Sequence, residues 1–192
     1  MQRSTIVEDR KRQIIDAFES CLSKKPYDAV TAREIASKAG ISTGLLYYYY
    51  KNKEDILLAY VNQSISKLSA IVVKWGSAVH SNASDFKTFL LDLLPFSRSY
   101  FSAMSSDDLR MFTNTWALSA GNPKVRRILC DQYDLFNETF ASVIKSGNFK
   151  TPDAEMTAKF LCCLLDGLAV NMVLYPDEGD PTGFFEHLIE LL

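Results

Sequence analysis

The stretch that most constrains this chain is residues 31–53, TAREIASKAGISTGLLYYYYKNK. Thr31 and Glu34 have the spacing of a capping box, in which a hydroxyl and a carboxylate satisfy the free amides at a helix start. Gly40 follows a short apolar run, where a helix can end in a left-handed residue that glycine adopts most easily. Ser42 can then cap a second helix. Two short helices joined by a tight turn predict a helix-turn-helix, although a helical hairpin without DNA-binding function fits the same spacing.

The residues around this turn decide between the two interpretations, because they resemble the N-terminal domain of the TetR family of one-component transcriptional regulators. The matching positions are Ile35, Ala36, Ala39, Gly40, Ser42, Gly44, Leu46, Tyr47, Asn52, Lys53 and Glu54. Pro26 departs from the family, in which a glycine commonly occupies this loop. The resemblance implies an all-α protein of about nine helices. A three-helix helix-turn-helix DNA-binding domain would occupy residues 1–54, and an effector-binding and dimerisation domain would occupy residues 55–192.

Candidate DNA contacts lie on both helices of the motif. The small Thr43 and Gly44 would let the second helix approach base edges closely. The side chains of Tyr47, Tyr48 and Tyr49 spread over about 200° around the helix, so at least two of their phenol groups should point outward. Leu46 and Tyr50 should face the core. Lys53, at the start of the next helix, could bind phosphate. The predicted DNA-binding residues are Thr31, Arg33, Ser42, Thr43, Gly44, Tyr47, Tyr48, Tyr49 and Lys53.

Charge and composition give weaker guidance. The net charge is -2, but residues 1–55 carry ten basic and eight acidic side chains, and the remainder carries eleven and fifteen. A mildly basic head suits phosphate, although an ordinary solvated surface explains the excess almost as well. The four cysteines lie within helical patterns, which indicates reduced core residues. We expect a cytoplasmic protein with no signal peptide, no metal site and no cofactor.

The remaining sequence predicts helices throughout. A long helix over residues 52–77 should be shared between two cores and act as a lever. Residues 84–101 form an apolar helix that Pro95 should kink or end near Leu94. Another helix is expected over residues 106–120. A capping residue followed by proline predicts the start of three further helices, near residues 123–146, 152–175 and 181–191.

The helix over residues 152–175 is apolar nearly all round. Asp166 and Asn171 interrupt it, and a membrane span needs about twenty apolar residues, so we expect no membrane insertion. A helix that is apolar on every side must be covered on every side, here by its own domain and by a second copy of the chain. The predicted residues of this homodimer interface are Phe160, Leu161, Leu164, Leu168, Phe184, Phe185 and Leu188.

The C-terminal half is also rich in large apolar residues, which could form either a plain core or an aromatic pocket for a hydrophobic effector. Asp166 stands out, because an ionised carboxylate in an apolar helix needs a partner. That partner could be a cationic effector, an arginine of the second subunit or a helix N-terminus, and a structural partner is preferred. The predicted ligand-binding residues are Trp75, Phe101, Phe112, Trp116, Tyr133, Phe136, Asp166 and Met172.

The leading interpretation is a homodimeric repressor that leaves an inverted-repeat DNA operator when a small molecule fills the C-terminal cavity. The alternative is a ligand-insensitive helical dimer that packages DNA or binds another protein. We do not expect an enzyme, because the sequence has no nucleophile–base pair, no clustered carboxylates and no phosphate-binding glycine loop.

Overall fold

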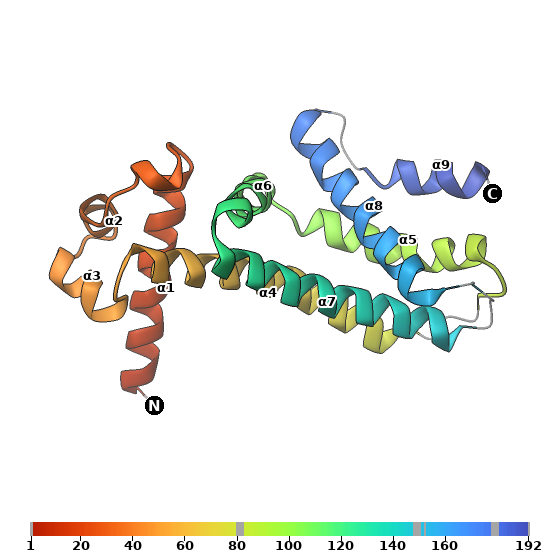
Figure 1. Cartoon of the computed structure of the whole chain (residues 1–192), viewed down its shortest axis with the longest axis horizontal. Coiled ribbons are helices and arrows are strands. Elements are labelled where there is room, and N and C mark those ends of the chain that lie inside the picture. The colour runs from red at the N-terminus through yellow and green to blue at the C-terminus, as the bar shows by residue number, and fades with distance from the viewer. Residues whose placement is uncertain (1, 80–82, 148–150, 152, 178–180, 192) are drawn as a thin grey trace. The chain divides into compact units, whose positions relative to one another are not determined.

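The computed structural model describes residues 2–79, 83–147, 151, 153–177 and 181–191, with side-chain detail from residue 6 onward (Figure 1). All regular secondary structure in these ranges is helical, in nine α-helices and one 3-10 turn, which confirms the predicted all-α fold. The chain divides into two compact units, Met1–Gln63 and Ser64–Leu192. This division lies nine residues beyond the predicted end of the first domain, because the first turns of the fourth helix pack into the N-terminal core.

The N-terminal unit consists of α1 (Gln2–Leu22), a 3-10 turn (Tyr27–Ala29), α2 (Ala32–Lys38), α3 (Thr43–Tyr49) and the first part of α4 (Lys53–Ala78). Phe18 of α1 is completely buried and meets the ring of Tyr60 of α4 edge-on, with the centroids 5.6 Å apart. Each helix of this unit therefore contributes to a single small core.

The turn between α2 and α3 has the predicted local structure. The Thr31 hydroxyl accepts a hydrogen bond from the Glu34 amide at 3.3 Å, and the Glu34 carboxylate accepts one from the Thr31 amide at 2.9 Å. Gly40 has a φ of 65°, and the Ile41 amide donates to the Ala36 carbonyl at 3.0 Å. This Schellman arrangement satisfies carbonyls at the end of α2. The helix-turn-helix is thus closed by bonds among residues near in sequence.

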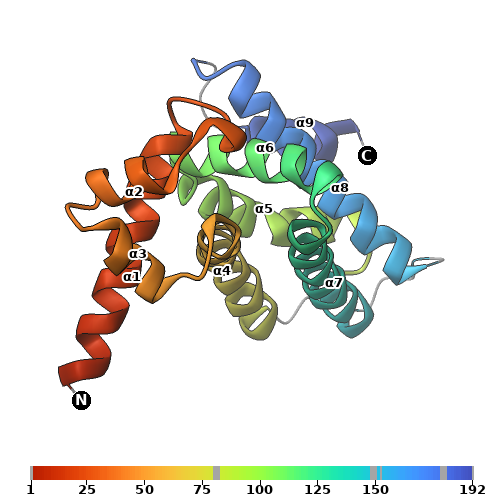
Figure 2. The same ribbon diagram turned by 60° about the vertical axis from the view of Figure 1, so that its left-hand side comes forward.

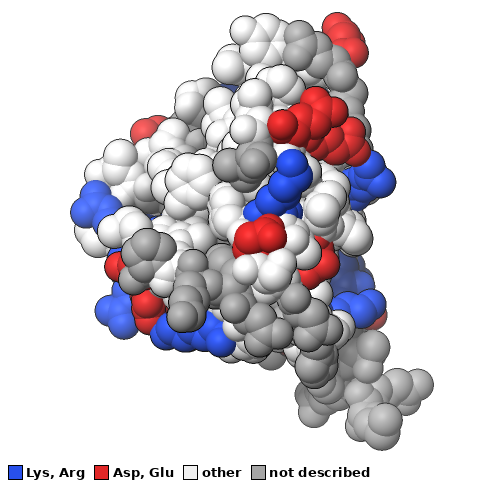
Figure 3. All heavy atoms as spheres, turned by 90° about the vertical axis from the view of Figure 1, so that its right-hand side faces the viewer, with Lys and Arg blue, Asp and Glu red and all other residues white. Residues whose placement is uncertain are grey.

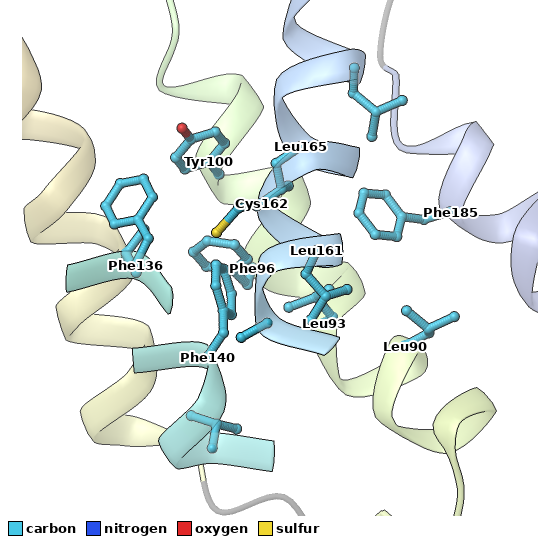
Figure 4. Packing of buried hydrophobic residues seen from close by; sticks show 14 of the residues in the cluster. Leu90, Leu93, Phe96, Tyr100, Phe136, Phe140, Leu161, Cys162, Leu165 and Phe185 are labelled. Atoms are coloured by element: carbon cyan, nitrogen blue, oxygen red, sulfur yellow. The ribbon is translucent and has the colours of Figure 1, made fainter. Parts of the chain in front are cut away.

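The C-terminal unit contains the rest of α4, α5 (Phe86–Ser102), α6 (Ser106–Gly121), α7 (Pro123–Ser146), α8 (Ala154–Leu174) and α9 (Gly183–Leu191). Helix α7 packs along α8, α6 contacts both, and α5 packs on α9 (Figures 1 and 2). In Figure 4, Phe96 of α5 and Phe140 of α7 meet beside Leu161 and Cys162 of α8. The core of this unit is therefore built from aromatic and aliphatic residues of several helices.

Three predicted helix limits need correction. Helix α5 does not end at Pro95, because buried residues on both sides of the proline, Leu93 and Phe96, belong to the same core. Helix α8 begins at Ala154 behind an Asp153 cap, and not behind Thr151; Pro152 lies outside the described residues.

Helix α9 also begins later than predicted. Pro181 lies in a turn, where its carbonyl accepts from the Phe184 amide, and the helix starts at Gly183; Asp180 lies outside the described residues. At α7 the prediction is confirmed, since the Asn122 side chain accepts from the amides of Lys124 and Val125.

The cysteines are all free, but only two of them are core residues. Cys21 and Cys162 are buried, whereas Cys130 and Cys163 are exposed, so the prediction of four core cysteines is wrong for the latter pair. Cys130 lies on the outer face of the amphipathic helix α7, and Cys163 lies on the exposed side of α8.

Candidate DNA-reading surface and effector cavity

Helix α3 presents two of its tyrosines to solvent. Its inner side is held by Leu46, which is completely buried, and by Tyr50, which is almost completely buried. Tyr47 keeps 48% of its surface exposed and Tyr48 keeps 77%, while Tyr49 is half-buried. The expectation that at least two phenol groups point outward is confirmed. Large exposed aromatic residues on a short helix are available for contacts outside the chain.

The other predicted DNA-binding residues divide by role. Arg33 and Gly44 are exposed, and Thr43 is half-buried at the first turn of α3. Thr31 and Ser42 are exposed, but their side chains already serve as helix caps; the Ser42 hydroxyl accepts from the Leu45 amide at 3.1 Å. These two hydroxyls therefore position the helices, whatever further contacts they make.

Lys53 is engaged within the chain, which differs from the expected free phosphate contact. Its ammonium donates to the carbonyls of Tyr27 and Val30, both at 3.0 Å, and lies 4.2 Å from the centre of the Tyr27 ring. Two of the three ammonium protons are thereby used. Lys53 ties the start of α4 to the turn that precedes α2. The sequence correctly predicts Lys53 at a helix start. Its hydrogen bonds to the carbonyls of Tyr27 and Val30 could not be predicted, because these residues are distant in the sequence.

A small cavity of about 40 Å³, partly open to solvent, lies inside the C-terminal unit. Five helices, α4 to α8, contribute its walls. The lining residues are Ile65, Leu68, Tyr100, Met111, Phe112, Thr115, Trp116, Leu129, Gln132, Tyr133, Phe136 and Asp166. The structure thus brings together five of the eight predicted ligand-binding residues, namely Phe112, Trp116, Tyr133, Phe136 and Asp166.

Trp75, Phe101 and Met172 do not line this cavity, so their assignment to it is corrected. Trp75 packs against Phe96 and Phe140, with ring centroids 4.8 and 5.3 Å away. Phe101 is buried in the core, and Met172 packs against that core. Residue type alone could not separate these positions from the cavity wall.

Several lining residues had escaped prediction, among them Tyr100, Met111, Thr115 and Gln132. Met111 and Thr115 lie beside the predicted Phe112 and Trp116 along α6, so helical spacing could have suggested them. Tyr100 gave no comparable signal, because it meets the cavity only through the packing of α5.

Asp166 has a structural partner in the same chain. The Tyr133 hydroxyl donates a hydrogen bond to its Oδ2 at 2.6 Å. Burial raises the pKa of Asp166 to about 6, and the bond from Tyr133 opposes this rise. Burial and the nearby carboxylate raise the pKa of Tyr133, so its phenol remains a proton donor. At neutral pH the cavity therefore contains a negatively charged group.

The predicted dimer residues do not share one surface. Phe160 and Phe184 are exposed at 52% and 51%, and Leu164 and Leu188 are half-buried. Leu161, Leu168 and Phe185 are buried in the core of their own chain, which corrects their assignment to an interface. The sequence pattern of α8 is apolar on both sides, so it could not show which side faces inward.

A continuous exposed stripe remains on α8. It consists of Met156, Phe160, Cys163, Gly167, Val170 and Leu174, spaced alternately by four and three residues. We call these six residues the α8 stripe. In the view of Figure 3, uncharged surface dominates and the charged side chains stand in small separate groups.

Comparison with known proteins agrees with this architecture. Residues 14–60 match the bacterial regulatory proteins of the tetR family, and residues 93–191 match the C-terminal domain of BetI-type transcriptional repressors. The fatty acid metabolism regulator protein of Bacillus subtilis strain 168 is 23% identical over 185 residues, covering 94% of this chain and 92% of that protein.

Solved structures share the fold. A transcriptional regulator from Saccharomonospora viridis in complex with choline has a TM-score of 0.70 at 24% identity, covering 95% of this chain and 94% of the other. FadR from Bacillus subtilis in complex with stearoyl-CoA has a TM-score of 0.70 at 20% identity, covering 94% and 96%. These relatives are transcriptional regulators, which disfavours the packaging alternative. The chain belongs to the TetR family and is a ligand-responsive, DNA-binding transcriptional regulator.

Proposed function

We propose that this regulator is a homodimeric repressor that leaves an inverted-repeat operator when a small hydrophobic molecule fills the C-terminal cavity. The observation that carries the proposal is that α4 contributes residues to both units of the chain. This one helix supplies Ile56 and Leu57 to the DNA-binding core and Ile65 and Leu68 to the cavity wall. A change in the cavity wall therefore acts on the helix that anchors the DNA-binding unit.

The DNA-reading surface is centred on α3. Tyr47 and Tyr48 offer exposed phenol groups, and Thr43 and Gly44 offer a narrow helix start for close approach to base edges. Arg33 extends this surface on α2. Each copy would read one half-site in the major groove, and two copies would read an inverted repeat.

The α8 stripe is the basis for the proposed dimer. Alternating spacings of four and three residues describe the seam along which two helices pack. Phe160 and Val170 would bury their exposed side chains against the second copy, and Gly167 would allow the backbones to approach. Phe184 of α9, which is also exposed, would add to the contact. A symmetric dimer of this kind matches the symmetry of an inverted-repeat operator.

The effector would act through differential affinity. A molecule can shift the protein away from its DNA-binding state only if it binds the other state more tightly. Ile65 and Leu68 provide that link, because an occupant that pushes on them shifts α4. In a dimer such a shift would change the separation of the two reading helices.

The regulator would work in the cytoplasm and would not catalyse a reaction, since its relatives are transcriptional regulators. Helices α4 and α8 are long and apolar enough to cross a membrane by length and composition. Their burial supports a different role, because Leu57 and Val72 of α4 and Leu161 of α8 are completely buried in protein cores.

The proposal is tested by incubating the purified protein with fragmented genomic DNA of its source at moderate salt and sequencing the recovered fragments. Enrichment of a short inverted repeat supports an operator-specific regulator, and the neighbouring genes then suggest effectors to test for release. Uniform recovery across the genome would contradict sequence-specific binding.

A further inference from the structure

The effector cavity has an unusual balance of charge. Its twelve lining residues include one carboxylate, Asp166, and no lysine, arginine or histidine. A carboxylate or phosphate that entered this space would meet a like charge and would find no cationic side chain to pair with. The interior therefore disfavours anions.

The carboxylate still has room for a partner. The Tyr133 hydroxyl donates a hydrogen bond to Oδ2 of Asp166, whereas Oδ1 has no hydrogen-bonding partner among the described residues. A carboxylate accepts about four hydrogen bonds when fully solvated. Partial burial raises the pKa of this carboxyl group to about 6, and no cationic side chain lines the cavity beside it.

Aromatic rings surround this charge. Tyr100, Phe112, Trp116, Tyr133 and Phe136 all line the cavity. Trp116 lies edge-on to Tyr133 with the ring centroids 6.0 Å apart, and 47% of its surface is exposed, which places it where the cavity meets solvent. Figure 4 shows Tyr100 and Phe136 near each other on α5 and α7. The faces of such rings attract cations, and tryptophan does so most strongly.

We propose that the effector of this cavity is a cation with an apolar body, a quaternary ammonium or a protonated amine, whose charge is held by Asp166 and by the faces of the surrounding aromatic rings. This inference rests on the proposed function, because it names the class of molecule that the effector cavity takes. The apolar body would fill the space beside Leu68, Met111 and Leu129.

Isosteric pairs of probes test the charge requirement on the full chain. Isothermal titration calorimetry would compare benzyltrimethylammonium with neopentylbenzene, and choline with 3,3-dimethylbutan-1-ol, so that each pair differs only by nitrogen in place of carbon. An anion, 4-phenylbutyrate, completes the set. We expect at least one cation to bind about tenfold or more tightly than its neutral isostere, and the anion to bind most weakly.

The variant Asp166→Asn removes the charge and keeps an acceptor for Tyr133. In this variant the preference for the cation should fall to about twofold or less. Asp134→Asn is the matched control, because Asp134 is exposed on α7 and does not line the cavity. This control should keep the preference. The comparison of isosteres on the natural chain remains decisive if Asp166→Asn fails to fold.

The proposal is overturned if neither cation binds, if the neutral isosteres bind equally well, if the anion binds most tightly, or if Asp166→Asn keeps the preference. Operator binding is measured separately. Specific operator binding without cation binding would overturn only the inference of a cationic effector. Cation binding without operator preference would overturn the proposed repressor function and leave the cation-binding site supported.

Discussion

At the scale of single residues, two charged side chains have roles that depend on partners far away in the sequence. Lys53 binds carbonyls more than twenty residues before it, and Asp166 accepts a bond from Tyr133, thirty-three residues before it. Both residues stand out in the sequence, because one is a charged group at a helix start and the other is a charged group in an apolar helix. Their partners could not be predicted, since nothing local determines which helices meet.

Replacing Lys53 by alanine tests its structural role. The variant leaves the carbonyls of Tyr27 and Val30 without their donor and should lower the free energy of unfolding by about 1–2 kcal/mol. Lys51→Ala, at an exposed neighbouring position, should change it by less than about 0.5 kcal/mol. Urea unfolding measures both. If Lys53 instead contacts DNA phosphate, Lys53→Ala will leave the free energy of unfolding unchanged. It will then reduce by about one the slope of the logarithm of the DNA-binding constant against the logarithm of salt concentration.

Asp166 makes stability depend on pH. Its pKa in the folded chain is about 6, above the ordinary value near 3.8, so the folded state binds the proton more tightly than the unfolded state. The resulting stabilisation is complete below pH 4 and is lost as the pH rises through 6. Between pH 7.5 and pH 5, the natural chain should gain about 1 kcal/mol relative to Asp166→Asn. Urea unfolding of both proteins at the two pH values checks this, and an equal response would refute it.

At the scale of elements, α4 approaches α7 closely at one glycine. A Cβ atom added to Gly76 would lie 2.3 Å from Cγ2 of Thr139, which is too close for any side chain to be accommodated without movement. The Thr139 hydroxyl meanwhile donates to the Leu135 carbonyl at 2.8 Å, which holds its side chain in place. The distance between α4 and α7 is therefore set by the absence of a side chain at Gly76.

Gly76→Ala should lower the free energy of unfolding by about 1–3 kcal/mol, despite the higher helix propensity of alanine. Adding Thr139→Ser, which removes the obstructing methyl group and keeps the hydroxyl, should recover most of this loss in a double-mutant cycle. Gly121→Ala is the control, because nothing lies within 4 Å of its added Cβ. An unchanged or increased stability of Gly76→Ala would show that the helices separate at little cost.

At the scale of the whole molecule, the α8 stripe decides the oligomeric state that we propose. Phe160→Glu places a charge within the stripe and should weaken self-association by at least about tenfold, because a buried unpaired charge is costly. Lys159→Glu changes a neighbouring exposed residue outside the stripe and should leave the dimer intact. Light scattering across a concentration series measures both. A Phe160→Glu protein that remains dimeric would place the interface elsewhere.

The helix-turn-helix and the helical character of the chain follow from patterns that are local in the sequence. The caps at Thr31 and Ser42 and the turn at Gly40 depend on hydrogen bonds and backbone angles among residues a few positions apart, so they can be read locally. Long-range packing, by contrast, makes Trp116 line a cavity while Trp75 packs against the core, and leaves Phe160 exposed while Leu161 is buried. These pairs are chemically alike, and what separates them is which distant helix covers each one.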